Sequence, residues 1–214
     1  MHYLRENKTL IFLVLILLPA FYFDRTIISW VKDNSTFYTE ARYHQTIDNL
    51  MKFVTHGATL IICSLILFVS AKSYNRKLSD AGRSLFIGLV TAGLLVQVFK
   101  HLIGRARPRV TFNTVFIGPT MHIDYDSFPS GHTTLSFCLA FILSHYYPRY
   151  RLFFYLFAVL TGMDRVIGLS HFPSDVLAGA LMGIVVARVL TARMSPLSAP
   201  VPSRYGQDST RQAC

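Results

Sequence analysis

Six apolar stretches alternate with polar, mostly basic segments along the 214-residue chain. They cover residues 9–23, 50–71, 84–103, 131–147, 152–168 and 173–192. A helix needs about 20 residues to cross the hydrocarbon core of a bilayer, and these stretches are close to that length. The pattern predicts an all-α fold, an integral membrane bundle of six transmembrane helices that occupies residues 1–193.

Three polar segments complete this picture. Residues 24–46 are mixed in charge and contain several aromatic side chains, so we expect a short, partly helical excursion along the membrane interface. Residues 194–214 contain Pro, Ser, Arg and Gln, a composition typical of a disordered tail, here cytoplasmic. Arg5 and Lys8 precede the first stretch as in a signal peptide. No small-x-small cleavage site follows that stretch, which favours a retained first helix.

The basic residues between the stretches indicate the orientation of the bundle. With six spans, one side of the membrane receives Arg5, Lys8, Lys72, Arg76, Lys77, Arg83, Arg149, Arg151, Arg193, Arg204 and Arg211. Cytoplasmic segments carry an excess of Lys and Arg, so we expect this side and both termini to be cytoplasmic. The opposite side receives Lys100, Arg105, Arg107 and Arg109. Basic residues placed against the general bias suggest a function on the outer face.

Composition agrees with a membrane protein. Hydrophobic residues make up 52% of the chain, charged residues only 15%, and the mean hydropathy is +0.40; soluble domains carry about 25% charged residues. The net charge of +10 would suit nucleic acid binding, but the basic residues lie between apolar runs. We therefore expect a lipid bilayer, and no nucleic acid, as partner. Cys63, Cys138 and Cys214 form no CxxC pair, which argues against a disulfide framework or a zinc site.

Three groups of polar residues fall at the outer ends of the predicted spans. They are Lys100-x6-Arg107-Pro108, Pro129-Ser130-Gly131-His132 and Arg165-x5-His171-x3-Asp175. Ionisable side chains near membrane depth are costly unless they line a cavity. In the second group a helix is expected to begin with Ser130 as N-cap, so its free N–H groups and positive dipole end can bind an anion. Together the groups predict a phosphate pocket on the outer face.

Each group also has a purely structural explanation when it is taken alone. Lys100 and Arg107 are compatible with interfacial anchors that snorkel. Ser130 is compatible with an ordinary helix start, and Asp175 with an acid matched to a helix dipole. We prefer the phosphate pocket because all three groups, with these spacings, share one face.

The three groups resemble, in order and spacing, the signature of the type 2 phosphatidic acid phosphatase superfamily, which includes integral-membrane lipid phosphatases, glucose-6-phosphatase and the vanadium haloperoxidases. The likeness runs from Lys100 to Asp175, and the six-span pattern extends it to most of the chain. One position departs from the signature. The family has Ser before the arginine of the third part, where this chain has Asp164. Asp164 either pairs with Arg165 and weakens its hold on phosphate, or turns away from it.

The resemblance implies a role for each residue of the signature. His171 is the nucleophile that takes the phosphoryl group as a phosphohistidine, and Asp175 sets its tautomer. His132 protonates the leaving oxygen and later activates the hydrolytic water. Pro173 suits position N1 of the last helix, which places Asp175 at N3, where it can reach back. The residues implied in phosphate binding are Lys100, Arg107, Ser130, Gly131 and Arg165.

A site of this kind needs no metal ion or other cofactor. Phosphoryl transfer depends mostly on positioning and on electrostatic stabilisation of the equatorial oxygens. The two arginines offer bidentate donors and Lys100 offers a point charge. The sequence shows no carboxylate cluster and no His-rich motif of a metal site.

The expected function is that of an integral-membrane lipid phosphatase. Substrates of the undecaprenyl pyrophosphate, phosphatidic acid, phosphatidylglycerol phosphate or lipid A type fit the site. The small size and lean loops are typical of a bacterial cytoplasmic (inner) membrane protein, whose active site would face the periplasm or cell exterior. The alternatives are a lipid phosphotransferase with the same site and a non-catalytic lipid-phosphate binder or transporter. A haloperoxidase is disfavoured by the six apolar spans.

Overall fold

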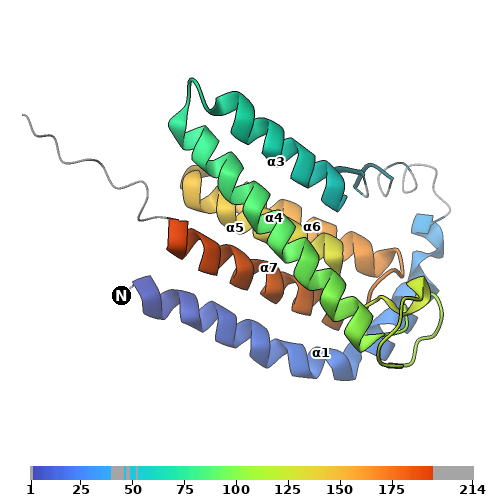
Figure 1. Cartoon of the computed structure of the whole chain (residues 1–214). Helices are drawn as coiled ribbons and strands as arrows, with labels where there is room; N and C mark the ends of the chain where they lie inside the picture. Colours follow the sequence, from blue (N-terminus) through green and yellow to red (C-terminus); the bar gives the residue numbers. More distant parts are fainter. Residues whose placement is uncertain (1, 40–45, 47–48, 52, 195–214) are drawn as a thin grey trace, which may run out of the picture.

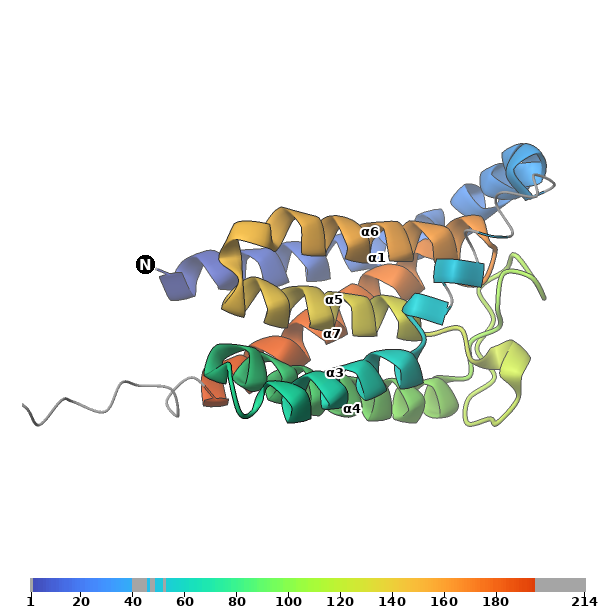
Figure 2. The same ribbon diagram turned by 90° about the horizontal axis from the view of Figure 1, so that it is seen from above.

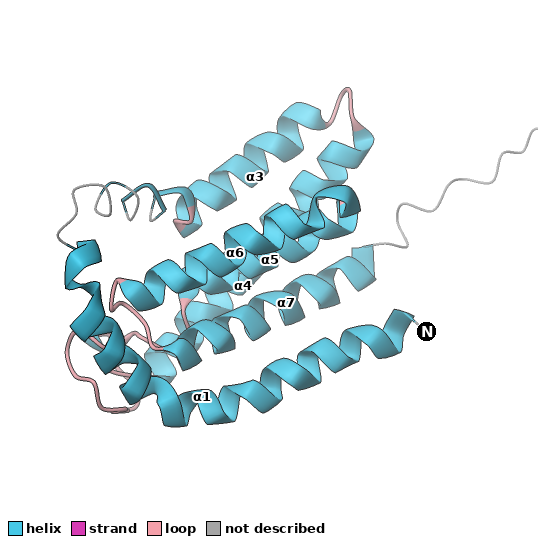
Figure 3. Cartoon of the chain, turned by 180° about the vertical axis from the view of Figure 1, so that it is seen from behind, coloured by secondary structure: helices cyan, strands magenta, loops and turns pink. Residues whose placement is uncertain are grey.

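The computed structural model describes residues 2–39, 46, 49–51 and 53–194. Within them lie the helices α1 (His2–Thr39), α3 (Gly57–Ala71), α4 (Arg76–Ile103), α5 (Gly131–Tyr146), α6 (Arg151–Ile167) and α7 (Pro173–Met194), and the short 3-10 helices η1 (Ile123–Tyr125) and η2 (Pro148–Tyr150). The described residues form no strand, only one isolated bridge between Arg105 and Phe116 (Figure 3). The all-α prediction is confirmed.

The helices lie side by side along a common direction (Figures 1 and 2). At one end of the bundle α4 and α6 end, α5 and α7 begin, and the 104–130 loop joins α4 to α5. We call this end the loop end. The N-terminus of α1, the turn between α3 and α4 and the last residues of α7 lie at the opposite end. Segments far apart in the sequence therefore meet at the loop end.

The core is centred on α5, which packs most extensively against α7. Its buried side chains come from four helices and are Leu60, Leu85, Leu89, Ala92, Leu135, Cys138, Ile142 and Ala187. A Cβ at Gly183 would lie 2.2 Å from the carbonyl oxygen of Thr134, and one at Gly179 would lie 2.6 Å from that of Ser130. The two glycines thus let the backbones of α5 and α7 touch, as small residues do in membrane helix pairs. This contact fixes the start of α5 against the first turns of α7.

The outer faces of the helices carry many exposed apolar side chains. On α6 these are Leu152, Phe153, Leu156, Val159, Leu160 and Met163. Within the described part of the chain, α4 and α7 are long and apolar enough to cross a membrane, and α3 is apolar but shorter. The count of six spans and the cytoplasmic position of the termini stay predictions.

Helix boundaries differ from the sequence prediction in three places. The first helix does not end at residue 23 but continues to Thr39, so residues 24–39 of the segment expected at the interface are helical and continuous with it. Helix α3 begins at Gly57 rather than at residue 50. Helix α4 begins at Arg76, before the apolar stretch, because Asn75 caps it by accepting the N–H of Leu78 at 3.0 Å. Most of residues 40–48 and all of 195–214, which include the tail predicted to be disordered, lie outside the described residues.

Candidate active site

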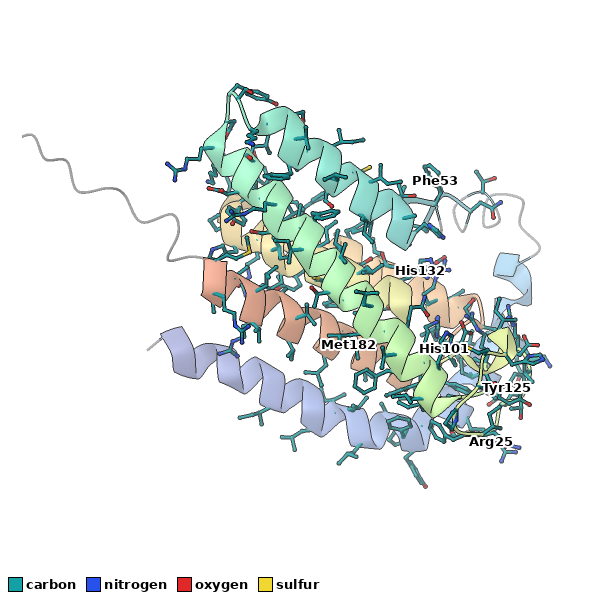
Figure 4. The ribbon with its side chains drawn as sticks, in the orientation of Figure 1. Arg25, Phe53, His101, Tyr125, His132 and Met182 are labelled. Carbon is teal, nitrogen blue, oxygen red and sulfur yellow. The ribbon has the colours of Figure 1, made fainter. Side chains whose placement is uncertain are left out.

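The three signature groups all lie at the loop end. Lys100 is in the last turn of α4 and Arg165 in the last turn of α6. His132 is in the first turn of α5, at the loop end in Figure 4, and Asp175 is the third residue of α7, as predicted. Because consecutive helices run in opposite directions, every second connection returns to this end. The sequence prediction that these residues share one face of the bundle agrees with this arrangement.

The N-terminus of α5 is held between α4 and α7. The N–H of Ser130 donates to the carbonyl oxygen of Asp175 at 3.0 Å. Gly131 lies next to the Lys100 side chain: a Cβ added at Gly131 would lie 3.9 Å from Lys100 Cε. Lys100 therefore lies beside the first turn of α5, where free N–H groups favour an anion.

Ser130 occupies the N-cap position, as predicted, but its side chain does not cap the helix. Its hydroxyl shares a hydrogen bond of 2.9 Å with Thr133 Oγ1, and the residue is fully buried. A contact between this hydroxyl and phosphate would require the side chain to turn. The role of Ser130 in phosphate binding stays a prediction.

His171 is buried in the short connection between α6 and α7. Its Nδ1 lies 2.8 Å from the carbonyl oxygen of Ser127 and 3.8 Å from Oδ2 of Asp175. A carbonyl oxygen only accepts hydrogen bonds, so Nδ1 carries the proton and Nε2 keeps its lone pair. The tautomer that the sequence assigned to Asp175 is thus set in the first place by the backbone of Ser127.

The environment of His171 also favours its neutral form. Burial lowers the pKa of its imidazole to about 4, and the positive charges of Lys100 and Arg107 act in the same direction. The carboxylate of Asp175 opposes this shift. An imidazole with this pKa is neutral at pH 7, which is the state that a nucleophile requires.

Asp175 is fully buried and well supplied with donors. Its Oδ2 accepts the Ser127 hydroxyl at 2.6 Å and the N–H of Phe172 at 2.8 Å, and its Oδ1 binds the guanidinium of Arg105. The bond from Phe172 confirms that Asp175 reaches back over the start of its own helix. Three donors hold the carboxylate in one orientation beside His171.

A carboxylate from the loop pairs with two of the cations assigned to phosphate. Asp126 Oδ1 lies 2.6 Å from Arg107 Nε, and its Oδ2 lies 3.3 Å from Lys100 Nζ. No sequence motif indicated a role for Asp126. Asp126 lies four positions before Ser130, but this spacing does not reveal that it pairs with Lys100, 26 residues earlier in the chain.

Asp164, the departure from the family signature, pairs with its neighbour. Its Oδ2 accepts from Arg165 Nε at 2.9 Å and also contacts Nη2. Both side chains are largely buried. Of the two alternatives left open by the sequence, the structure shows the paired one.

His132 faces a groove between α3, α4 and α5. The groove has a volume of about 460 Å³, and its polar end is formed by Lys100, Gly131 and His132. Further along, its walls are mostly apolar and include Ile61, Val90, Leu94 and Leu135. A polar end that continues into an apolar channel suits an amphipathic ligand.

Arg105 and Asp24 are two further buried charged residues near the site, and neither belongs to the sequence signature. Both have no exposed surface, and Arg105 Nη2 lies 2.6 Å from Asp24 Oδ2. Asp24 follows the first apolar stretch, so its position resembled the end of a span. Its partner lies 81 residues further along the chain, beyond the reach of a local pattern.

A family model described as the PAP2 superfamily matches residues 81–197, more than half of the chain, and includes every residue of the three groups. The chain belongs to this superfamily. Lipid A 1-phosphatase of Rhizobium etli is 36% identical to this PAP2 protein over 181 residues, which cover 71% of this chain and 76% of the relative. Undecaprenyl-diphosphatase BcrC of Bacillus subtilis is 28% identical over 164 residues, which cover 75% of this chain and 81% of the relative.

The fold has a solved counterpart. The crystal structure of a transmembrane PAP2 type phosphatidylglycerolphosphate phosphatase from Bacillus subtilis superimposes with a TM-score of 0.67 at 22% identity, covering 90% of this chain and 98% of the other. The superfamily resemblance drawn from the sequence is confirmed. This PAP2 protein is a membrane-embedded phosphoric ester hydrolase.

Proposed function

We propose that this PAP2 enzyme removes a phosphate group from a membrane lipid at the loop end, through a phosphohistidine intermediate on His171. The observation that carries the proposal is the 2.8 Å hydrogen bond between His171 Nδ1 and the Ser127 carbonyl oxygen. This bond leaves Nε2 as an unprotonated nucleophile, and burial keeps the imidazole neutral at pH 7.

The reaction has two steps with balanced proton transfers. First, His171 Nε2 forms a bond to phosphorus while the bond from phosphorus to the lipid oxygen breaks, and His132, held as an imidazolium by the negative charge of the bound phosphate, gives that oxygen a proton. Second, His132 takes a proton from water, the water oxygen attacks phosphorus, and the phosphorus–nitrogen bond breaks. Phosphate leaves and both histidines return to their starting states. Lys100, Arg107 and Arg165 stabilise the charge on the equatorial oxygens throughout.

We further propose that a hydrocarbon chain of the substrate lies in the groove between α3, α4 and α5. The groove begins at Lys100 and His132 and continues between apolar walls. A lipid in it has its phosphate at the polar end and its chain removed from water. Gly93, which lines the groove, contributes to its width.

Among phosphorylated lipids, we propose a lipid A-type substrate first. The 36% identical relative from Rhizobium etli is a lipid A 1-phosphatase, whereas phosphatidylglycerophosphatase B and undecaprenyl-diphosphatase BcrC of Bacillus subtilis are 29% and 28% identical. The active site is proposed to lie on the outer face of a bacterial inner membrane. This is supported by the basic residues at the opposite end, which include Arg76, Arg149 and Arg193.

A phosphate-release screen with purified protein in detergent tests the substrate. It compares lipid A, undecaprenyl pyrophosphate, phosphatidic acid and phosphatidylglycerol phosphate, with His171→Gln as the inactive control. We expect the fastest release from lipid A and none with the variant. Faster release from another lipid would overturn the substrate, and release by His171→Gln would overturn the nucleophile. Transfer of the phosphate to an added lipid, in place of release, would favour the phosphotransferase.

A further inference from the structure

Arg105 is a fully buried charge in the loop that follows α4. Its guanidinium lies 4.2 Å from the ring centroid of Phe172 and 5.0 Å from that of Phe21. Aromatic rings thus cover it on α1 and just before α7. A charge enclosed in this way is costly unless hydrogen bonds and opposite charges offset the loss of water. The hydrogen-bond and ion-pair partners of Arg105 must therefore offset the cost of burying its charge.

The guanidinium joins two carboxylates on different helices. Its Nη1 binds Asp175 Oδ1 and donates to the Ser174 hydroxyl at 2.6 Å. Its Nη2 donates to Asp24 Oδ2 at 2.6 Å. Arg105 thus connects the carboxylate beside His171 to the first helix of the bundle.

Asp24 completes this connection from α1. Its Oδ1 accepts the N–H of Ser174 at 3.0 Å, and its Oδ2 also accepts the Ser174 hydroxyl. Ser174 is the second residue of α7, where a backbone N–H has no partner within the helix. Asp24 therefore holds both Arg105 and the start of the helix that carries Asp175.

The backbone of Arg105 contacts the other group that faces His171. The carbonyl oxygen of Arg105 accepts the N–H of Ser127 at 3.0 Å. The carbonyl oxygen of Ser127 in turn accepts from His171 Nδ1 at 2.8 Å. Arg105 thus holds, through its side chain and its main chain, both acceptors that surround Nδ1.

We propose that Arg105, clamped by Asp24, is a positioning residue that orients His171 for attack through Asp175 and Ser127. In the described part of the chain its side-chain hydrogen bonds go to Ser174, Asp175, Asp24 and Thr114, none of which is assigned to phosphate. This inference rests on the proposed role of His171 as nucleophile. Its consequence is that α1, which lies outside the matched family region, takes part in organising the active site.

Arg105 and Asp24 also influence the electrostatic environment of His171. Arg105 offsets the carboxylate of Asp175, and Asp24 offsets Arg105. The titratable and charged groups around His171 at the loop end are Asp24 on α1, His56 before α3, Lys100 on α4, Arg105, Arg107 and Asp126 in the loop, His132 on α5, Asp164 and Arg165 on α6, and Asp175 on α7. Loss of the positive Arg105 lets the Asp175–His171 pair take up a proton at higher pH. Loss of the negative Asp24 moves that proton uptake to lower pH.

The test measures kcat, KM and the acid limb of kcat/KM for Arg105→Gln, Arg105→Lys and Asp24→Asn, using a phosphorylated lipid in detergent. We expect Arg105→Gln to lower kcat about 10- to 100-fold with little change in KM, and Arg105→Lys to recover part of the loss. The acid limb should move up by about one pH unit in Arg105→Gln and down in Asp24→Asn. A purely structural role would lower activity without these opposite shifts.

Arg109→Gln is the matched control, because Arg109 lies in the same loop but is half-exposed and pairs with Asp124. It should leave kcat and the pH profile unchanged. If Arg105→Gln does not fold, as judged by its elution profile and thermal unfolding in detergent, Asp24→Asn and Arg105→Lys decide the question. Unshifted acid limbs in folded variants would overturn the positioning role. Activity in His171→Gln would instead overturn the proposed function itself.

Discussion

At the scale of single residues, two carboxylates share the cations that are assigned to phosphate. Asp126 pairs with Lys100 and Arg107, and Asp164 pairs with Arg165. Three positive charges are thus offset by two negative ones. A phosphoryl group must compete with these carboxylates for the same N–H donors, so we expect the acids to set the affinity of the site.

Asp164 offers the clearest test of this competition. Asp164→Ser removes the carboxylate that binds the Arg165 guanidinium and restores the residue of the family signature. A buried hydrogen bond to a charged group contributes about 1.5–3 kcal/mol. We therefore expect inhibition by vanadate, a phosphate analogue, to become about tenfold tighter. Asp164→Asn, of nearly equal size, is the control for volume. Equal or weaker inhibition in Asp164→Ser would show that Asp164 orients Arg165 and does not compete with the ligand.

The acid limb of the activity profile reports on His171. Burial lowers the pKa of this imidazole to about 4, so it stays neutral, and able to attack, until the pH falls through that value. We expect kcat/KM to be half lost near pH 4 and not near 6.5, the ordinary value for histidine. Steady-state rates between pH 3 and 8, with stability checked at each pH, measure this. A midpoint near 6.5 would contradict the burial of the nucleophile.

The sequence predicted the site residues that belong to short motifs but missed their partners. Helix ends and fixed spacings placed Lys100, His132 and Asp175 at one face. Asp24 and Asp126 could not be found in this way, because their roles depend on contacts with residues far along the chain. Such pairings arise only when the helices pack.

At the scale of helices, the hydropathy pattern predicted the starts of the later helices closely and the bounds of the earlier helices less well. Helices α5, α6 and α7 begin within one residue of the predicted limits. Helix α4 begins earlier because its first turn is polar and depends on the Asn75 cap, which a hydropathy pattern does not detect. Helix α1 continues past residue 23, where Asp24 pairs with the buried Arg105 and does not mark a helix end.

The groove between α3, α4 and α5 gives a prediction at this scale. Gly93→Leu fills the groove, since the nearest atom to a Cβ at this position is Leu135 Cδ2 at 4.0 Å. We expect KM for a long-chain lipid phosphate to rise about tenfold, equivalent to losing the burial of about two CH₂ groups. A water-soluble phosphate ester should be hydrolysed as before. Gly93→Ala, which makes only an ordinary contact, is the control. An equal loss for both substrates would place the chain elsewhere.

At the scale of the whole molecule, exposed apolar side chains cover the sides of the bundle, and the charged groups of the candidate site lie at the loop end. Exposed Leu, Ile, Val and Phe residues occur on α1, α3, α4 and α6. An exposed apolar surface of this extent is stable against lipid and not against water.

Labelling with a membrane-impermeant maleimide tests which face this end occupies. Met121→Cys lies in the 104–130 loop and Tyr74→Cys in the turn at the opposite end, and the native side chains are 83% and 74% exposed. In a Cys63→Ser, Cys214→Ser background and sealed right-side-out vesicles, we expect only Met121→Cys to react. Permeabilised vesicles should label both. Reaction of Tyr74→Cys alone would reverse the proposed orientation.

The most direct test of the central claim is to trap phosphate on His171. The protein is mixed with a ³²P-labelled lipid phosphate, quenched with alkali, and digested to locate the label. We predict an alkali-stable, acid-labile label on His171 and none in His171→Gln. In His132→Gln the label should form more slowly and, once formed, be lost more slowly, because His132 serves both steps. His122→Gln, an exposed histidine of the same loop, should label as the wild type does. Phosphate release that continues in His171→Gln, or a wild-type enzyme that turns over without label on this residue, would contradict the account.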